Sequence, residues 1–255
     1  MAARIDLNAD VGESWGAFRV GDDAALLPLV SSANLACGFH GGDPLTLRRT
    51  LDLCARHGVA VGAHPSFADL RGFGRRELPA EPEELEADLL YQVAALQGLA
   101  RARGLTLRHV KPHGALYNLA ARDERVARCV ARAVAQLDGG LVLVGLAGSS
   151  ALRAAAAAEG LRLAGEAFAD RGYAPDGALL PRSAPGALLG DPAAVAAQAV
   201  SLARDGCVRA SDGSRLAVAA ETLCLHGDSP GAPALAAAVR AALLAAGLSI
   251  QPLSA

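Results

Sequence analysis

The sequence predicts an α/β protein of one domain, residues 1–255, folded as a β/α barrel with seven parallel strands. Short β-like runs alternate with helical stretches along the whole chain, no linker or internal repeat divides it, and 52% of its residues are apolar. Alternating strands and helices favour a parallel sheet with crossover helices. The sequence has no GxGxxG after the first expected strand and no GxxxxGK[ST], which favours a closed barrel over an open nucleotide-binding sheet.

Each element is placed by periodicity and by helix start and stop signals. Strands are expected at 4–9, 32–36, 59–63, 107–111, 141–145, 161–165 and 222–225. Helices are expected at 44–58, 82–104, 122–137, 149–159, from 192 onward and at 232–246; three of them begin with an acidic residue followed by proline. The long segments 65–79 and 167–190, rich in glycine and proline, are expected to be site loops, and 207–218 a small hairpin.

Composition and charge narrow the class of protein. The net charge is −2 and no run of basic residues exceeds two, so the sequence predicts neither a nucleic-acid partner nor a membrane anchor. The five cysteines are odd in number and far apart, which favours a reducing compartment over a disulfide framework. The amino-terminal stretch lacks the apolar run of a signal peptide. We expect a cytoplasmic protein that acts on small molecules.

Polar residues gather at one end of the expected barrel. Reacting groups of a parallel barrel lie at the carboxyl ends of the strands, and six of the seven expected strands deliver polar residues there. In the first strand Asp6, Asn8 and Asp10 alternate with apolar residues, so this polar face should point into the barrel. The candidates are Asn8, Asp10, Glu13, Asn34, Cys37, His40, His64, Lys111, His113, Asn118, Glu166, Asp170, His226 and Asp228.

The chain contains a single lysine, Lys111, and only three asparagines, Asn8, Asn34 and Asn118. In a chain where arginine takes the place of surface lysine, a surviving lysine marks a position that arginine cannot fill. We expect Lys111 to stabilise a developing oxyanion or a phosphoryl group. The alternative is a buried ion pair with Asp6 or Asp10.

Four histidines at strand ends can act as metal ligands, as acid–base groups or as plain hydrogen-bonding side chains. Three histidines and a carboxylate suit zinc or a related ion with an open position, which makes His40, His64 and His113 the metal candidates, although no spacing is a recognised ligand motif. His109 is expected to support the core or the site. A nucleophile formed by Cys37 and His40 is a further alternative that lacks an identifiable orienting partner.

Arginines are concentrated in the two long loops. Arg71, Arg75 and Arg76 lie in the first, and Arg171 and Arg182 in the second. Their forked guanidinium groups suit recognition of carboxylate or phosphate. Solvated surface charge is the alternative.

Seven segments together resemble the LamB/YcsF family. They are IDLNADVGESWG (5–16), SANLACGFHGGDP (32–44), GAHPSF (62–67), GFGRR (72–76), VKPHGALYN (110–118), EAFADRGY (166–173) and CLHGDSP (224–230), with Trp15 and Gly41 as mild departures. The resemblance covers nearly the whole chain. It implies a barrel akin to the glycoside hydrolase and polysaccharide deacetylase barrels. It also implies a hydrolase that opens 5-oxoproline to glutamate with hydrolysis of ATP, taken with magnesium, in a complex with two partner subunits, B and C.

The chemistry of that reaction suggests a role for each polar residue at the strand ends. Asp10 or Glu13 is expected to activate water, Lys111 and loop arginines to stabilise the phosphorylated oxygen, and His113 or His226 to protonate the leaving nitrogen. Arg171 is expected to bind the substrate carboxylate. Expected substrate-binding residues are Asn8, Asn34, His40, His64, Arg75, Glu166, Asp170, Arg171 and Asp228.

Two other functions remain open from the sequence. One is a metal-dependent carbohydrate deacetylase built on Asp10, His64 and His113. The other is a non-catalytic subunit that binds 5-oxoproline for its partners. The sequence has no phosphate-binding loop, so we expect ATP to lie largely on a partner or at an interface.

Overall fold

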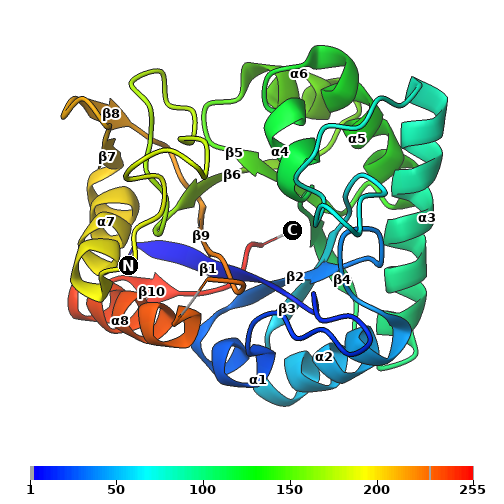
Figure 1. The fold of residues 1–255 in the computed structure, drawn as a ribbon, viewed down its shortest axis with the longest axis horizontal. Coiled ribbons are helices and arrows are strands. Elements are labelled where there is room, and N and C mark those ends of the chain that lie inside the picture. The colour runs from blue at the N-terminus through cyan, green and yellow to red at the C-terminus, as the bar shows by residue number, and fades with distance from the viewer. Residues whose placement is uncertain (1–2, 230, 255) are drawn as a thin grey trace.

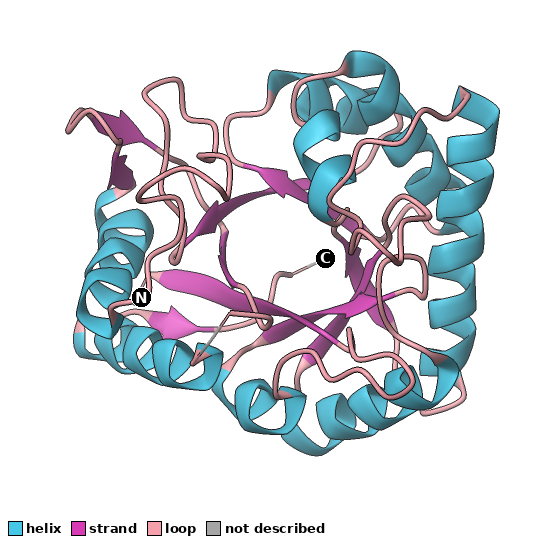
Figure 2. Ribbon diagram, in the orientation of Figure 1, coloured by secondary structure: helices cyan, strands magenta, loops and turns pink. Residues whose placement is uncertain are grey.

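The computed structural model describes residues 3–229 and 231–254 and shows a closed barrel of parallel strands with helices packed around it (Figures 1 and 2). The strands follow chain order around the barrel, and the last closes the ring by pairing with the first. The predicted seven-stranded β/α barrel is confirmed. Its strands are β1 (Arg4–Val11), β2 (Ser32–Ala36), β3 (Ala60–His64), β4 (Leu107–Val110), β5 (Val142–Leu146), β6 (Leu163–Phe168) and β9 (Thr222–Leu225).

Three further strands lie outside the ring. The hairpin expected at 207–218 is confirmed, because β7 (Cys207–Arg209) pairs antiparallel with β8 (Arg215–Ala217). Figure 1 shows this hairpin at the periphery, next to α7. A two-residue strand, β10 (Ser249–Ile250), pairs with the first residues of β1 at the amino end of the barrel.

The helices begin where the sequence indicates. Asp43 and Asp191 accept hydrogen bonds from backbone amides in the first turns of α2 and α7, and Glu84 accepts one from the amide of Glu81 at the start of α3. No helix among the described residues is long and apolar enough to cross a membrane. The helices are α1 (Asp23–Leu26), α2 (Pro44–His57), α3 (Pro82–Arg101), α4 (Gly114–Ala120), α5 (Glu124–Leu137), α6 (Ser150–Ala158), α7 (Pro192–Asp205) and α8 (Ala232–Ala245), with a 3-10 turn, η1 (Leu27–Leu29).

Several predicted boundaries are wrong. The single helix expected at 122–137 is preceded by a second one, α4, which starts directly after His113 and has no side-chain cap to signal it. Elements of two to four residues, such as α1 and β10, are too short for periodicity to detect. Strand β6 ends at Phe168 rather than at 165, so Glu166 lies inside the strand.

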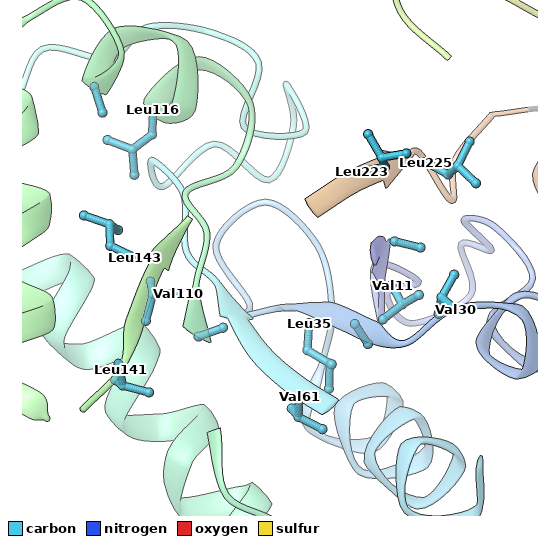
Figure 3. Packing of buried hydrophobic residues seen from close by; sticks show 14 of the residues in the cluster. Val11, Val30, Leu35, Val61, Val110, Leu116, Leu141, Leu143, Leu223 and Leu225 are labelled. Carbon is cyan, nitrogen blue, oxygen red and sulfur yellow. The ribbon is translucent and has the colours of Figure 1, made fainter. Parts of the chain in front are cut away.

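Apolar and polar residues separate onto the two faces of the strands. Side chains such as Leu35, Val61 and Leu143 are buried between the strands and the surrounding helices (Figure 3). Burial of this apolar surface stabilises the barrel by about 25 cal/mol for each Å² removed from water. The alternate face of β1 points into the barrel and carries Asp6 and Asn8, as predicted.

Gly62 of β3 makes room inside the barrel for an imidazole. A Cβ atom at this position would collide with the ring of His109, which comes from the neighbouring strand β4. The ring of His109 uses this space to place Nε2 2.7 Å from Oδ1 of Asn34. His109 is therefore a supporting residue of the barrel interior, as expected.

Candidate active site

A cavity of about 770 Å³ opens at the carboxyl ends of the strands. Asp10, His64, Lys111 and Glu166 line it from four different strands or strand ends. Both long glycine-rich loops add residues to its wall, Arg75 from the first and Arg171, Tyr173 and Arg182 from the second. The structure thus brings together, in one pocket, the groups that the sequence assigned to strand ends and site loops.

Lys111 is the centre of what we call the lysine network (Asn8, Asp10, Asn34, Lys111 and Glu166). Its Nζ lies 2.9 Å from Oδ1 of Asp10 and 2.9 Å from Oε1 of Glu166. Asn34 donates to Asn8 and to Asp10 at 2.7 and 2.8 Å, and Asn8 donates to Glu166 at 3.0 Å. Nζ also lies 3.0 Å from the thiol of Cys224. These bonds fix the ammonium group at the floor of the cavity.

The ion pairs of the lysine network outweigh the cost of burying its charges. Burial alone would lower the pKa of Lys111, but Asp10, Cys224 and Glu166 raise it well above the usual value. Burial would raise the pKa of Asp10, but His64 and Lys111 hold it well below the usual range. Lys111 is therefore a fixed cation, and Asp10 is an ionised carboxylate beside it.

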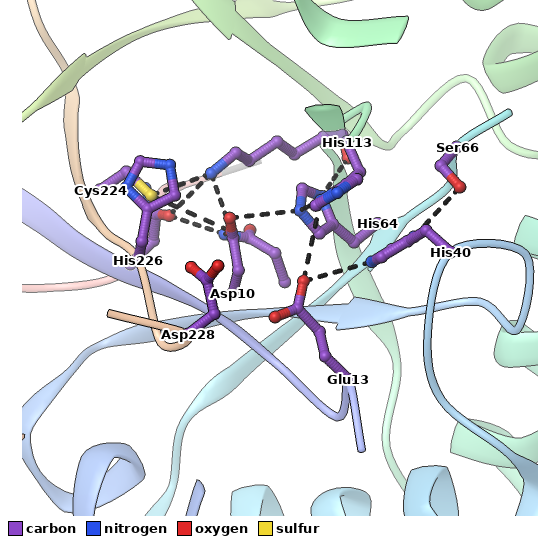
Figure 4. A network of polar contacts seen from close by, with 12 residues as sticks. Asp10, Glu13, His40, His64, Ser66, His113, Cys224, His226 and Asp228 are labelled. Carbon is purple, nitrogen blue, oxygen red and sulfur yellow. Dashed lines mark hydrogen bonds and ion pairs between the residues drawn. The ribbon is translucent and has the colours of Figure 1, made fainter. Parts of the chain in front are cut away.

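A second group, the histidine cluster (Glu13, His40, His64 and His113), lies next to the lysine network (Figure 4). Each of the four residues offers one nitrogen or oxygen atom, and these atoms lie within 4.8 Å of one another. All four side chains are buried. The cluster matches the metal candidates from the sequence and adds Glu13 as the carboxylate.

Hydrogen bonds to groups outside the cluster orient its three histidine rings. Nδ1 of His64 lies 2.6 Å from the carbonyl oxygen of Lys111, and Nε2 of His113 lies 2.9 Å from that of Phe73. Nδ1 of His40 lies 3.1 Å from Oγ of Ser66. Gly74 lets the loop pass over them, since its φ of +65° is left-handed and a Cβ there would press on His113 and His40. The loop 65–79 thus fixes the orientation of the cluster.

His226 is arranged differently from the other three histidines. Its Nδ1 lies 3.0 and 3.1 Å from the two oxygens of Asp170, so the carboxylate holds the proton on Nδ1. Burial would raise the pKa of Asp170, but the charge of His226 lowers it. Nε2 is left for the cavity, which His226 lines. This arrangement suits a group that accepts or donates a proton at the reacting centre.

The arginines have different positions from one another. Arg75 forms an ion pair with Asp228, and Nη1 of Arg182 lies 4.0 Å from the same carboxylate. Arg171 is buried and donates from Nε to the carbonyl of Ala187 and from Nη2 to that of Leu180. The hydrogen bonds of Arg171 therefore hold together the loop 169–190, which lines the cavity. Arg75 and Arg182 lie nearer to solvent.

Two polar atoms of the cavity wall have no hydrogen-bond partner among the described residues: the hydroxyl of Tyr117 and Oε2 of Glu166. Burial raises the pKa of Tyr117 well above its usual value, so the hydroxyl keeps its proton as a donor. Sequence reasoning missed Tyr117, although it lies in the VKPHGALYN segment. It also missed Phe168, whose ring lies 5.5 Å from Nζ of Lys111.

The buried ion pair that was the alternative for Lys111 is present, with Asp10 as the partner. Asp6 does not pair with Lys111; it accepts hydrogen bonds from Ser31, Ser32 and Thr222 deeper in the barrel. The alternative of a cysteine nucleophile is wrong. Cys37 is not an activated nucleophile, because burial raises the pKa of its thiol to about 12 and its Sγ donates to the carbonyl of Leu35. The roles of the remaining strand-end candidates stay predictions. Those that line the cavity are Asp10, His64, Lys111, His113, Asn118, Glu166 and His226, whereas its lining does not include Asn8, Glu13, Asn34, His40, Asp170 and Asp228.

A closed β/α barrel whose strand ends converge on a buried lysine, carboxylates and imidazoles has the architecture typical of barrel enzymes. The chain belongs to the LamB/YcsF family, whose model matches residues 5–255. It is 57% identical to the A subunit of 5-oxoprolinase from Chloroflexus aggregans, over 97% of this chain and 98% of that protein. It is 52% identical to the corresponding protein of Syntrophobacter fumaroxidans, which bears the same name, over 99% of both chains.

A solved structure supports the same conclusion. The lactam utilization protein of Thermus thermophilus is similar to this chain with a TM-score of 0.93 and 52% identity, over 98% of this chain and 100% of that one. The family resemblance inferred from the seven segments is confirmed.

Proposed function

We propose that this chain is the A subunit of a 5-oxoprolinase, which opens 5-oxo-L-proline to L-glutamate while ATP, with magnesium, is hydrolysed to ADP and phosphate. Partner subunits B and C complete the enzyme. The observation that carries the proposal is the near full-length identity above 50% with proteins that are named as the A subunit of 5-oxoprolinase. The alternative of an independent deacetylase has no comparable support.

The cavity complements the groups of a five-membered lactam acid. Such a substrate has one N–H donor, one carbonyl acceptor and one carboxylate. The residues that line the cavity include a carboxylate acceptor, Glu166, and a hydroxyl donor, Tyr117, whose pKa burial and the nearby Glu166 raise. Arg75 and Arg182 share the Asp228 carboxylate and have further donors for the carboxylate of the substrate.

In the proposed reaction, the charged and proton-transferring groups of the cavity act in turn on the lactam. The γ-phosphoryl group of ATP passes to the lactam oxygen and ADP leaves; Lys111 stabilises the negative charge on this oxygen. Water then adds to the ring carbon and gives a proton to Asp10. The C–N bond breaks as His226, oriented by Asp170, protonates the nitrogen from Nε2. A second water hydrolyses the resulting γ-glutamyl phosphate, so that two waters are consumed for each lactam opened.

The test is release of glutamate and phosphate from 5-oxoproline and ATP, with this chain alone, with subunits B and C, and with each mixture lacking one component. We expect turnover only in the complete mixture. The Asp10→Asn variant should lose turnover by about 10³-fold or more, while the control Asp52→Asn, at an exposed position of α2 away from the cavity, should keep it. No turnover in any mixture of folded proteins would contradict the assignment.

A binding measurement separates catalysis from mere delivery of substrate. If Asp10 acts in the chemical step, Asp10→Asn should retain affinity for 5-oxoproline in calorimetry while turnover is lost. Equal loss of affinity and turnover would favour the non-catalytic binding role.

A further inference from the structure

The imidazoles of His64 and His113 in the histidine cluster are in contact, but neither ring, when neutral, has a proton to donate to the other. Nε2 of His64 and Nδ1 of His113 lie 3.0 Å apart, within hydrogen-bond distance. The other nitrogen of each ring faces a backbone carbonyl, of Lys111 or of Phe73, and a carbonyl oxygen can only accept. Each neutral ring therefore carries its proton on the far side. In that state the two near nitrogens point unshared electron pairs at each other, and either a metal cation or a shared proton is needed to make this contact favourable.

Negative charge surrounds the same point. Oε1 of Glu13 lies 3.7 Å from Nδ1 of His113, and Oδ2 of Asp10 lies 3.3 Å from Nε2 of His64. Figure 4 shows these atoms turned toward one another from β1, from the end of β3 and from the segment after β4. Arg75 and Lys111, the nearby permanent cations, are already paired with Asp228 and with Asp10 and Glu166. The position between the two imidazoles and Glu13 is therefore surrounded by electron pairs and lies beside the Asp10 carboxylate.

We propose that His64 Nε2, His113 Nδ1 and Glu13 Oε1 bind one divalent transition-metal ion, with zinc as the type case. Two nitrogens and one carboxylate oxygen form a donor set that suits zinc and its neighbours better than magnesium or calcium. Ligand atoms at about 2.05 Å from a tetrahedral ion lie about 3.3 Å apart. The observed separations of 3.0 and 3.7 Å lie on either side of this value. The rings of His64 and His113 are perpendicular, with centroids 4.8 Å apart, so they are not stacked on each other.

His40 supports the site from behind instead of completing it. Its ring is stacked parallel to that of His113 with centroids 3.7 Å apart, so the in-plane electron pairs of these two rings run side by side and do not converge. Nε2 of His40 lies 3.2 Å from Oε1 of Glu13, which positions the carboxylate.

A fourth position of the ion remains open to the cavity. His64 and His113 line the cavity wall, whereas Glu13 and His40 lie behind it. Three protein ligands and one open position are typical of catalytic zinc, while structural zinc is closed by four protein ligands. An ion at this point stands beside Asp10, where it can polarise a substrate oxygen or a water molecule. The ion site rests on its own geometry and stands whether or not the reaction is opening of a lactam.

Metal content of the whole chain tests the proposal without an activity assay. The tag-free protein is stripped with chelator, dialysed and titrated with zinc in competition with a chromophoric chelator; a second titration with cobalt records its visible absorption. We expect one equivalent per chain. His64→Gln, His113→Gln and Glu13→Gln should each weaken zinc binding by at least about 100-fold, and His40→Gln by about 10-fold.

The matched control is His57→Gln, a histidine exposed at the end of α2, which should bind zinc like the wild type. Circular dichroism checks that each variant is folded; if one is not, the other two ligand variants decide. Absence of saturable binding would overturn the proposal, as would a stoichiometric ion that survives all three ligand variants. In either case a proton shared by His64 and His113 balances the contact.

Discussion

The lysine network and the histidine cluster lie side by side in the mouth of one barrel, and both are buried, but their charges are balanced in different ways. Lys111 meets Asp10 and Glu166 at 2.9 Å, so its cation is paired within the chain. The histidine cluster contains nitrogens with their electron pairs turned inward and a carboxylate, Glu13, whose pKa is raised well above the usual value by burial and by Asp10 and Asp228. The first region holds its cation within the chain, and the second is shaped for a cation from outside.

The lysine network and the histidine cluster are both buried but differ in charge pairing, so burial alone does not identify the role of a polar group. A paired charge in the interior stabilises the folded state only modestly, yet removing one partner is costly. A group of unpaired acceptors lowers the stability of the folded state until a ligand arrives. The four predictions that follow probe this contrast, from the largest expected effect to the smallest.

The largest effect is expected from Lys111→Met in the lysine network. Removing the cation leaves Asp10 and Glu166 buried without a counter-charge, which should lower the free energy of unfolding by about 3–5 kcal/mol. Turnover of the assembled enzyme should fall by about 10³-fold or more. Urea denaturation and the glutamate-release assay measure the two effects. Arg108→Met, at an exposed position of β4, the strand that precedes Lys111, is the control. If Lys111→Met had the same free energy of unfolding as the wild type, the buried carboxylates would tolerate the loss of their cation. The proposed difference between the lysine network and the histidine cluster would then be wrong.

The next largest effect is expected from Asp170. Its carboxylate orients His226, whereas backbone carbonyls orient His64 and His113 in the histidine cluster. Asp170→Asn should lower kcat by about 10²–10⁴-fold with little change in KM, because the amide no longer fixes the proton on Nδ1 of His226. Steady-state kinetics of the assembled enzyme measure it. Asp52→Asn, at an exposed position of α2 outside the cavity wall, is the matched control. A change confined to KM would assign Asp170 to substrate binding instead of to proton transfer.

A smaller effect is expected from His109, which supports the lysine network through Asn34. Burial, with the charges of Lys111 and His64, lowers the pKa of His109 to about 3. Between about pH 6.5 and pH 3 the unfolded chain binds a proton that the folded chain does not, so stability falls as pH falls, by about 1.4 kcal/mol per pH unit. In His109→Gln this contribution should disappear from the pH dependence of unfolding. A slope identical to that of the wild type would show that the ring is protonated in the folded protein.

The smallest effect is expected from His64→Gln in the metal-free chain. Removing one of two facing electron pairs offsets part of the packing that is lost, so stability should change by less than about 1 kcal/mol. Urea denaturation in chelator, beside Lys111→Met, measures the contrast directly. A loss comparable to that of Lys111→Met would show that the histidine cluster is as fully paired as the lysine network.

Sequence reasoning reached most of the fold because alternation of polar and apolar residues is a local signal. In β1 the alternation of Asp6, Asn8 and Asp10 with apolar neighbours predicts both the strand and its inward face. The acid–proline pairs at 43–44, 81–82 and 191–192 place three helix starts for the same reason. Short elements such as α4, and the ends of β1 and β6, depend on tertiary pairing and were therefore missed or misplaced.

Which residues gather at the site could be predicted from the sequence, because parallel strands bring their carboxyl ends to one rim, and Asp10, His64 and Lys111 lie at or next to those ends. How these residues pair depends on the tertiary structure. Lys111 meets Asp10 and not Asp6, and His226 joins Asp170 apart from the other three histidines. Arg171 binds loop carbonyls, and Tyr117 faces the cavity without a partner among the described residues. Pairing depends on the register and stagger of strands distant in sequence and on where loops cross the rim, and neither is encoded in local periodicity.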